Sequence, residues 1–101
     1  MSVVVVATFY PKPGHHDAVH AVIAAAQTDV YAEPGCQLYA LHEASDRFVL
    51  VEKWESPEAL VAHGEADALN RLVADVAPLV DPAVDLVELT PVAGDHPAST
   101  I

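Results

Sequence analysis

Four side chains near the middle of this sequence could together bind an aromatic ligand and transfer a proton in an apolar pocket: Tyr39, Glu52, Trp54 and His63. An imidazole changes its charge near neutral pH. The pKa of a carboxyl group on an apolar face depends strongly on its surroundings. Indole and phenol rings can form the wall of a pocket and stack on an aromatic ligand. Their spacing puts them on neighbouring predicted elements.

His63 is the candidate catalytic residue. It lies on the apolar side of its predicted helix, one turn after Leu60. If it faces a pocket, it can accept a proton from a phenol, whose deprotonation at pH 7 costs roughly 4 kcal/mol for a pKa of about 10. The alternative is a buried histidine whose ring is satisfied by a backbone carbonyl.

Glu52 shares one face of its predicted strand with Leu50 and Trp54, so its carboxylate lies among apolar neighbours. A buried carboxylate is costly unless it is paired. We therefore expect a partner for Glu52, within the chain or across a dimer. An ion pair or a hydrogen-bonded anchor is the favoured interpretation, and a catalytic base is the alternative.

Four other residues complete the predicted substrate-binding set with Glu52. Tyr39 and Trp54 are either pocket wall or plain core. His42 ends the second predicted strand, where it either makes a hydrogen bond at the pocket edge or meets solvent. Phe9, near the end of the first predicted strand, is the fourth.

Two other groups of reactive side chains point to ordinary structure. Cys36 follows a turn and has no basic cluster beside it, so we interpret it as a small buried hydrophobic residue. His16 and His20 have a spacing that can bind a metal, with Asp17 adjacent, but they lie off the buried stripe of their helix. No second pair of ligands is evident, and we predict no metal site.

Length and charge exclude several classes of function. The chain has 101 residues, enough for one domain, and a net charge of −11 from fifteen acidic and four basic residues. Without a basic cluster we expect neither nucleic acid nor an anionic membrane as a partner. The apolar run at residues 3–7 is too short to span a membrane. The single cysteine suits a reducing compartment, so we expect the cytoplasm.

Six elements alternate between strand-like and helix-like patterns. Strands are predicted over residues 2–10, 37–42, 48–54 and 83–89, and helices over residues 15–32 and 57–80. The second helix has Ser56 as N-cap, Pro57 in its first position and an interruption at Gly64. We take residues 1–90 as the domain and expect residues 91–101 to form a flexible tail.

This order of elements predicts an α+β fold, the ferredoxin-like split βαβ arrangement with a four-stranded antiparallel sheet. Its two helical segments can cover only one face of the sheet. The first strand has valines at positions of both parities, so both of its faces should be covered. A second copy packed sheet to sheet is the economical cover, and we predict a homodimer.

The central pattern resembles the antibiotic biosynthesis monooxygenase (ABM) family of dimeric α+β barrels over residues 3–89. The residues that carry the resemblance are Glu33-Pro34-Gly35-Cys36, Tyr39, Leu41, His42, Phe48, Leu50, Glu52, Trp54, Ala59, Leu60 and His63. The resemblance implies a pocket between sheet and helices in each protomer. It also implies oxygenation of phenols, quinols or polyketides by O₂ without metal or flavin, so no cofactor is expected.

The resemblance leaves three functions open, because one fold hosts several reactions. The first is a cofactor-independent monooxygenase for a small aromatic substrate, with His63 as the base. The second is a non-catalytic dimer that binds a small hydrophobic metabolite. The third is an isomerase of a small signalling molecule, against which the scarcity of Lys and Arg counts where the substrate is phosphorylated.

Overall fold

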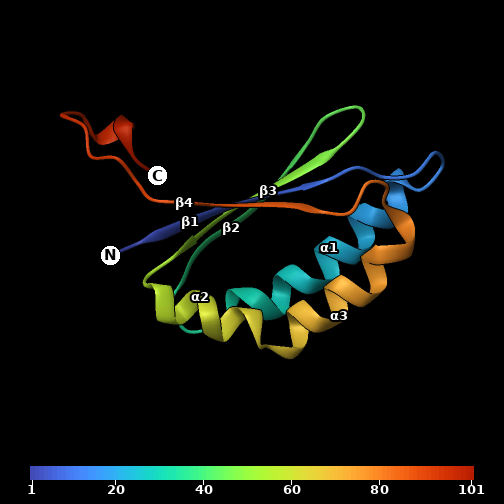
Figure 1. The fold of residues 1–101 in the computed structure, drawn as a ribbon, viewed down its shortest axis with the longest axis horizontal. Coiled ribbons are helices and arrows are strands. Elements are labelled where there is room, and N and C mark those ends of the chain that lie inside the picture. The colour runs from blue at the N-terminus through green and yellow to red at the C-terminus, as the bar shows by residue number, and fades with distance from the viewer.

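A four-stranded antiparallel sheet with helices on one face makes up the domain (Figure 1). The structure is a computed structural model that describes residues 1–101. The strands are β1 Val3–Phe9, β2 Cys36–Glu43, β3 Phe48–Trp54 and β4 Asp85–Leu89. The helices are α1 His16–Tyr31, α2 Pro57–Gly64 and α3 Asp67–Val76, with short 3₁₀ turns at Ala77–Leu79 and Pro97–Ser99. The ferredoxin-like α+β fold predicted from the order of elements is confirmed.

The sheet has the order β2-β3-β1-β4, so β1 and β3 form its centre. In the β1–β3 register Val5 lies opposite Glu52 and Ala7 lies opposite Leu50. β4 is shorter than predicted and begins at Asp85, where it pairs with Thr8 of β1. Beyond Phe9 the strand β1 ends, and only an isolated bridge joins Pro11 to Val80. Residues 83 and 84, which were predicted as strand, lie outside β4.

Alternation along β3 divides the sheet into two faces. Phe48, Leu50, Glu52 and Trp54 point toward the helices and are buried, while the residues between them are half-buried on the other face. We call the two sides the inner face and the outer face. All three helices lie on the inner side (Figure 1). The inner face therefore carries the hydrophobic core and every side chain considered for chemistry on β3.

Helix α1 packs on the inner face through one apolar stripe. Val19, Ile23, Ala26 and Val30 are its buried residues. After β3, the Ser56 hydroxyl accepts a hydrogen bond from the amide of Ala59 at 3.1 Å, and Pro57 opens α2. The interruption predicted at Gly64 is also present, since α2 ends there and α3 starts at Asp67.

The turn between α1 and β2 fits closely under α2. Gly35 has a φ of +83°, and a Cβ at this position would lie 2.5 Å from the Cβ of Ala59. Only glycine combines this backbone conformation with so close an approach. The Gly35 carbonyl also accepts a hydrogen bond from the Glu55 amide at 2.8 Å. These contacts hold the preceding Glu33 beside α2.

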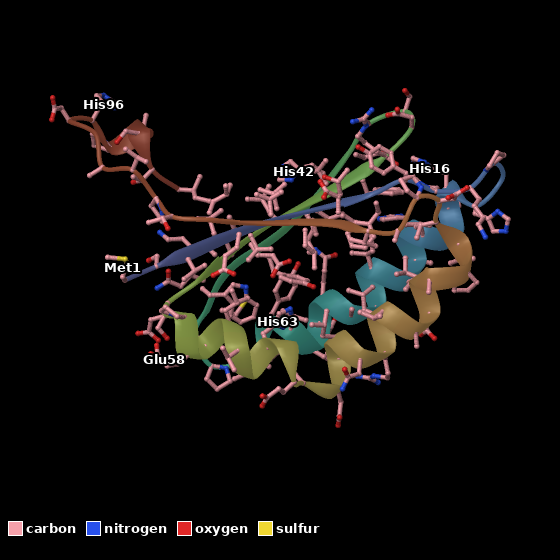
Figure 2. The ribbon with its side chains drawn as sticks, in the orientation of Figure 1. Met1, His16, His42, Glu58, His63 and His96 are labelled. Atoms are coloured by element: carbon pink, nitrogen blue, oxygen red, sulfur yellow. The ribbon has the colours of Figure 1, made fainter.

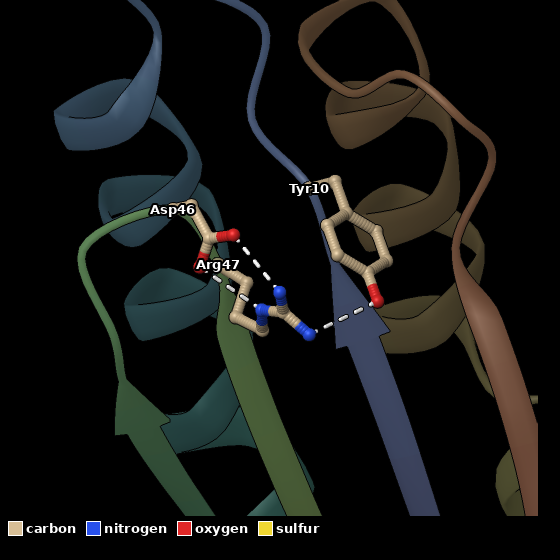
Figure 3. Close-up of polar contacts among 3 residues, drawn as sticks. All are labelled: Tyr10, Asp46 and Arg47. Atoms are coloured by element: carbon tan, nitrogen blue, oxygen red, sulfur yellow. Dashed lines mark hydrogen bonds and ion pairs between the residues drawn. The ribbon is translucent and has the colours of Figure 1, made fainter.

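The far end of the β2–β3 hairpin is tied to the end of β1 (Figure 3). Arg47 makes two hydrogen bonds to the Asp46 carboxylate, at 3.0 and 2.9 Å, and its guanidinium lies 4.9 Å from the centre of the Tyr10 ring. A longer hydrogen bond, 3.4 Å, joins Arg47 to the Tyr10 hydroxyl. The contacts of Arg47 with Asp46 and Tyr10 thus join the hairpin loop to the end of β1, at the end of the sheet that is remote from α2.

The C-terminal residues turn back over the outer side of the sheet beside the start of β1 (Figure 1). There the Lys53 ammonium donates a hydrogen bond to the carbonyl of Ile101. A shallow hollow at this point is lined by Val4, Leu89 and residues of the tail. None of the helices has the length and apolar character that crossing a membrane requires.

Candidate active site

His63 is buried between two carboxylates. Its exposed fraction is 3 %, and its Nδ1 lies 2.8 Å from Oε1 of Glu33. Its Nε2 faces Oε1 of Glu52 at 3.8 Å. Figure 2 shows the ring between the helices and the sheet. The partner of this histidine is thus a carboxylate in the α1–β2 turn rather than a backbone carbonyl.

Glu52 has the partner that its buried position requires, and the partner lies within the same chain. Its Oε1 accepts a hydrogen bond from the indole N–H of Trp54 at 3.0 Å. Burial raises the pKa of the Glu52 carboxyl above its ordinary value, and the nearby Glu33 charge adds to the increase. The Trp54 hydrogen bond and the charge of His63 partly oppose it. A carboxylate with a raised pKa is a stronger base than an exposed one.

Three rings, those of His63, Trp54 and Tyr39, pack against one another beside the Glu33 and Glu52 carboxylates. The His63 ring stacks on Trp54 with centroids 4.4 Å apart. Tyr39 meets both rings edge-on, at 5.7 Å from His63 and 6.5 Å from Trp54. Burial, and then the charges of Glu52 and Glu33, raise the pKa of the Tyr39 hydroxyl. Tyr39 therefore remains a neutral hydrogen-bond donor, and its hydroxyl has no partner within the protein.

A cavity of about 380 Å³ lies next to these groups, between the inner face of the sheet and α3. Glu52 is the single charged residue in a wall that is otherwise apolar or aromatic. Its size and apolar lining are typical of a small-molecule site. The lining residues are Ala7, Phe9, Tyr39, Leu50, Glu52, Leu69, Leu72, Val73, Val76, Ala77, Val80, Ala83, Val84 and Leu86.

The structure brings some of the predicted site residues together and separates others. Tyr39, Glu52 and Phe9 line the cavity. His63 and Trp54 lie directly behind Glu52, outside the cavity wall. His42 lies apart from them, exposed near the hairpin, where its Nδ1 lies 3.1 Å from the Ala40 carbonyl (Figure 2). The roles of these residues in substrate binding and catalysis stay predictions.

Glu33 is the member of this group that the sequence alone did not identify. In the sequence it is one acidic residue in a Glu-Pro-Gly turn, and its proximity to His63 depends on how α2 crosses that turn. Its second carboxylate oxygen, Oε2, is buried without a hydrogen-bond partner. The Pro-Gly turn was the available signal, because it fixes where the residue before it must lie.

The other reactive side chains are accounted for by local contacts. Cys36 is a free, half-buried thiol whose pKa is raised by burial and by the charges of Glu33 and Glu52. His16 contacts the Glu43 carboxylate at 2.9 Å, and the rings of His16 and His20 pack on Phe48. No group of three or more His, Cys, Asp or Glu side chains is arranged to hold a metal ion.

The raised pKa of Glu52 predicts a pH-dependent effect of Glu52→Gln. The folded state holds the proton to higher pH than the unfolded state, so wild-type stability falls as the pH rises from about 4.5 through the folded-state pKa. The neutral amide of the variant avoids this loss, and its carbonyl oxygen can still accept the Trp54 hydrogen bond. We expect Glu52→Gln to gain stability over wild type, on the order of 1 kcal/mol near neutral pH.

Urea unfolding at several pH values between about 4 and 8 measures this difference. Glu58→Gln, at the exposed start of α2 (Figure 2), removes the same charge and serves as the control. A Glu52→Gln variant whose advantage shrinks as the pH rises contradicts the assignment.

Comparison with known proteins agrees with this geometry. Residues 2–75 match the antibiotic biosynthesis monooxygenase (ABM) family. The Mycobacterium tuberculosis protein named "Putative monooxygenase Rv0793" is 34% identical over 91 residues, which cover 88% of this chain and 90% of that protein. The structure of Rv0793 superimposes with a TM-score of 0.88 at 31% identity, covering 95% of this chain and 100% of that one. The structure of PA3566 from Pseudomonas aeruginosa gives a TM-score of 0.83 at 26% identity, covering 91% and 95%. This chain belongs to the antibiotic biosynthesis monooxygenase family.

Proposed function

We propose that this protein is a cofactor-independent monooxygenase that oxidises a small aromatic phenol, quinol or polyketide-like substrate with O₂. The observation that carries the proposal is the apolar cavity of about 380 Å³ with the Glu52 carboxylate in its wall. Tyr39 is also a lining residue, and its hydroxyl would be a second polar group for a ligand. Membership of the ABM family supports the same reaction class.

The lining of the cavity favours a neutral aromatic substrate. No Lys or Arg is present in the wall, so an anionic carboxylate or phosphate would have no charged partner there. A phenolic hydroxyl, in contrast, can donate to Glu52 and accept from Tyr39. The cavity is therefore poorly suited to an isomerase that acts on a phosphorylated signalling molecule.

The proposed reaction begins when the substrate O–H bond breaks and its proton moves to Glu52. The resulting phenolate passes one electron to O₂, which gives a phenoxyl radical and superoxide. The two radicals combine to a peroxide anion, which takes back the proton held by the protein and becomes a hydroperoxide. Loss of water from the hydroperoxide leaves a quinone. The protein supplies a dry pocket, orientation and the base. His63, predicted as the catalytic residue, would act through Glu52, because Glu52 stands between its ring and the cavity.

Oxygen uptake by metal-free and flavin-free protein, with a panel of quinols and naphthols, tests this proposal. We expect wild type to consume O₂ with at least one of them. Glu52→Gln should lower turnover by about 10²- to 10⁴-fold, because it removes the proton acceptor. His63→Ala should lower it by at least about 10-fold, and His96→Ala in the tail is the matched histidine control. Wild-type protein that oxidises no member of the panel faster than buffer contradicts the proposal.

The second candidate is a dimeric binding protein for a small hydrophobic metabolite. One observation favours it: the Glu52 oxygen nearest His63 already accepts a hydrogen bond from Trp54. That hydrogen bond lowers the tendency of this oxygen to take a proton. In that case the same compounds would raise the unfolding temperature without O₂ uptake. Glu52→Gln would then change only the affinity.

We also propose that a second copy of the chain covers the outer face. Six apolar residues on this face of β1, β3 and β4 remain without a covering helix: Val4, Val6, Val49, Val51, Val87 and Leu89. Val87 and Leu89 are each 43 % exposed. The tail covers this face only beside Val4 and Leu89. A partly covered apolar face of this kind is typical of an interface, and sheet-to-sheet packing about a two-fold axis would bury it.

Val51→Lys tests this dimer, because Val51 pairs with Val6 at the centre of the sheet. A charge buried in the interface without a partner should convert the dimer to monomer at micromolar concentration. Sedimentation velocity measures the change, and circular dichroism checks that the variant is folded. Val61→Lys, on the exposed surface of α2, is the control. A monomeric wild type, or a Val51→Lys variant that stays dimeric, contradicts the proposal.

A further inference from the structure

Glu33, His63 and Glu52 form a buried row that leads away from the cavity. Glu52 reaches the cavity wall, His63 lies behind it, and Glu33 closes the row on the far side of the imidazole. The side chains of His63 and Glu52 are 4 % and 5 % exposed, and that of Glu33 is 16 % exposed. The row therefore lies in a poorly solvated region where the position of each proton matters.

The contact between Glu33 and His63 sets the state of the imidazole ring. An ionised carboxylate can only accept hydrogen bonds, so Nδ1 at 2.8 Å from Glu33 must carry a hydrogen. A neutral ring then has no hydrogen on Nε2, and the lone pair of this nitrogen faces Glu52. Glu33 thus fixes the tautomer in which the ring can receive a proton from Glu52.

The second oxygen of Glu33 indicates that its charge has a use beyond anchoring the ring. This Oε2 atom is buried and makes no hydrogen bond, a costly arrangement for a carboxylate. A glutamine would avoid the buried charge, but its amide can donate to a bare Nδ1 as well as accept from Nδ1–H, so it would not fix the tautomer. A carboxylate stabilises an imidazolium in addition, as the buried aspartate does in a Ser-His-Asp triad.

We propose that Glu33 is a positioning residue, which holds His63 as its Nδ1–H form so that Nε2 can take the proton that Glu52 removes from the substrate. This inference rests on the proposed function for the origin of that proton. In the step, the Glu52 O–H bond breaks and an Nε2–H bond forms on His63. Glu52 is again a carboxylate, and an imidazolium lies between two carboxylates. No electrons are transferred in the step.

The remaining contacts are compatible with this transfer. Trp54 stacks on the His63 ring and donates to Glu52 Oε1, so one residue orients both partners. The 3.8 Å separation between Nε2 and Glu52 must shorten for transfer. Catalytic hydrogen bonds are often long in ligand-free structures and tighten in the complex.

The ring state of His63 tests the proposal without relying on turnover. Long-range ¹H–¹⁵N NMR on full-length protein with labelled histidine distinguishes a protonated ring nitrogen from a bare one, and His63→Ala assigns the signals. We expect wild-type His63 to be in the Nδ1–H form. In Glu33→Gln the amide can donate to Nδ1, so we expect the neutral ring to shift to the Nε2–H form.

The same variant separates a positioning role from a merely structural one. Glu33→Gln removes a charge whose Oε2 atom is buried without a hydrogen bond, so its unfolding temperature should equal or exceed that of wild type. Its O₂ uptake should nevertheless fall at least about 10-fold, as in His63→Ala, because the wrong tautomer disables the same imidazole, and in a Ser-His-Asp triad it costs about 10⁴-fold. Glu43→Gln is the matched control, because it removes the carboxylate from the exposed His16–Glu43 pair. It should leave both the His63 signals and turnover unchanged.

Two results would overturn the proposal: an Nε2–H ring in wild type, or a Glu33→Gln variant with wild-type turnover. Should Glu33→Gln not fold, the wild-type ring state decides alone. If wild type oxidises no substrate, the proposed monooxygenase function fails, and the two ring states still decide whether Glu33 sets the tautomer of His63.

Discussion

The burial of the Glu52 carboxylate on an otherwise apolar sheet face is the constraint on which the site depends. A carboxylate in this position is costly unless hydrogen bonds and a nearby cation compensate it. Trp54 supplies a hydrogen bond, and the His63 ring stands close enough to stabilise the charge when it is protonated. The same burial raises the pKa of the group and places it in the wall of a cavity. A single feature thus connects stability, basicity and access to a ligand.

Three parts of the fold, a strand, a helix and a turn, meet at one end of the sheet and provide this arrangement. β3 carries Glu52 and Trp54 with the same parity, α2 brings His63 over them, and the α1–β2 turn brings Glu33 under α2. The close approach of Gly35 to Ala59 fixes the spacing between that turn and the helix. The cavity lies between the sheet and α3, and apolar side chains of α3 form the wall opposite the sheet. Glu52, Trp54 and His63 are therefore held by regular elements and Glu33 by a turn, while the cavity is shaped by α3 and the residues that follow it.

Sequence reasoning reached the fold because its signals are local. The spacing of Val19, Ile23 and Val30 determines the buried face of α1, and Ser56-Pro57 determines where α2 begins. The parity of Glu52 indicated a buried carboxylate in need of a partner. The identity of this partner could not be predicted, since it depends on the position at which α2 packs on the sheet. For the same reason Glu33, 30 positions before His63, was recognised only as part of a turn.

The most direct test of the account is a crystal structure of the protein with 2-naphthol, prepared without oxygen. We predict that the naphthol ring lies in the cavity between Leu50 and the α3 residues Leu72 and Val76, with its hydroxyl within hydrogen-bond distance of the Glu52 carboxylate. A naphthol bound elsewhere, with the cavity empty or with its hydroxyl turned away from Glu52, would contradict the central claim that this carboxylate receives the substrate proton.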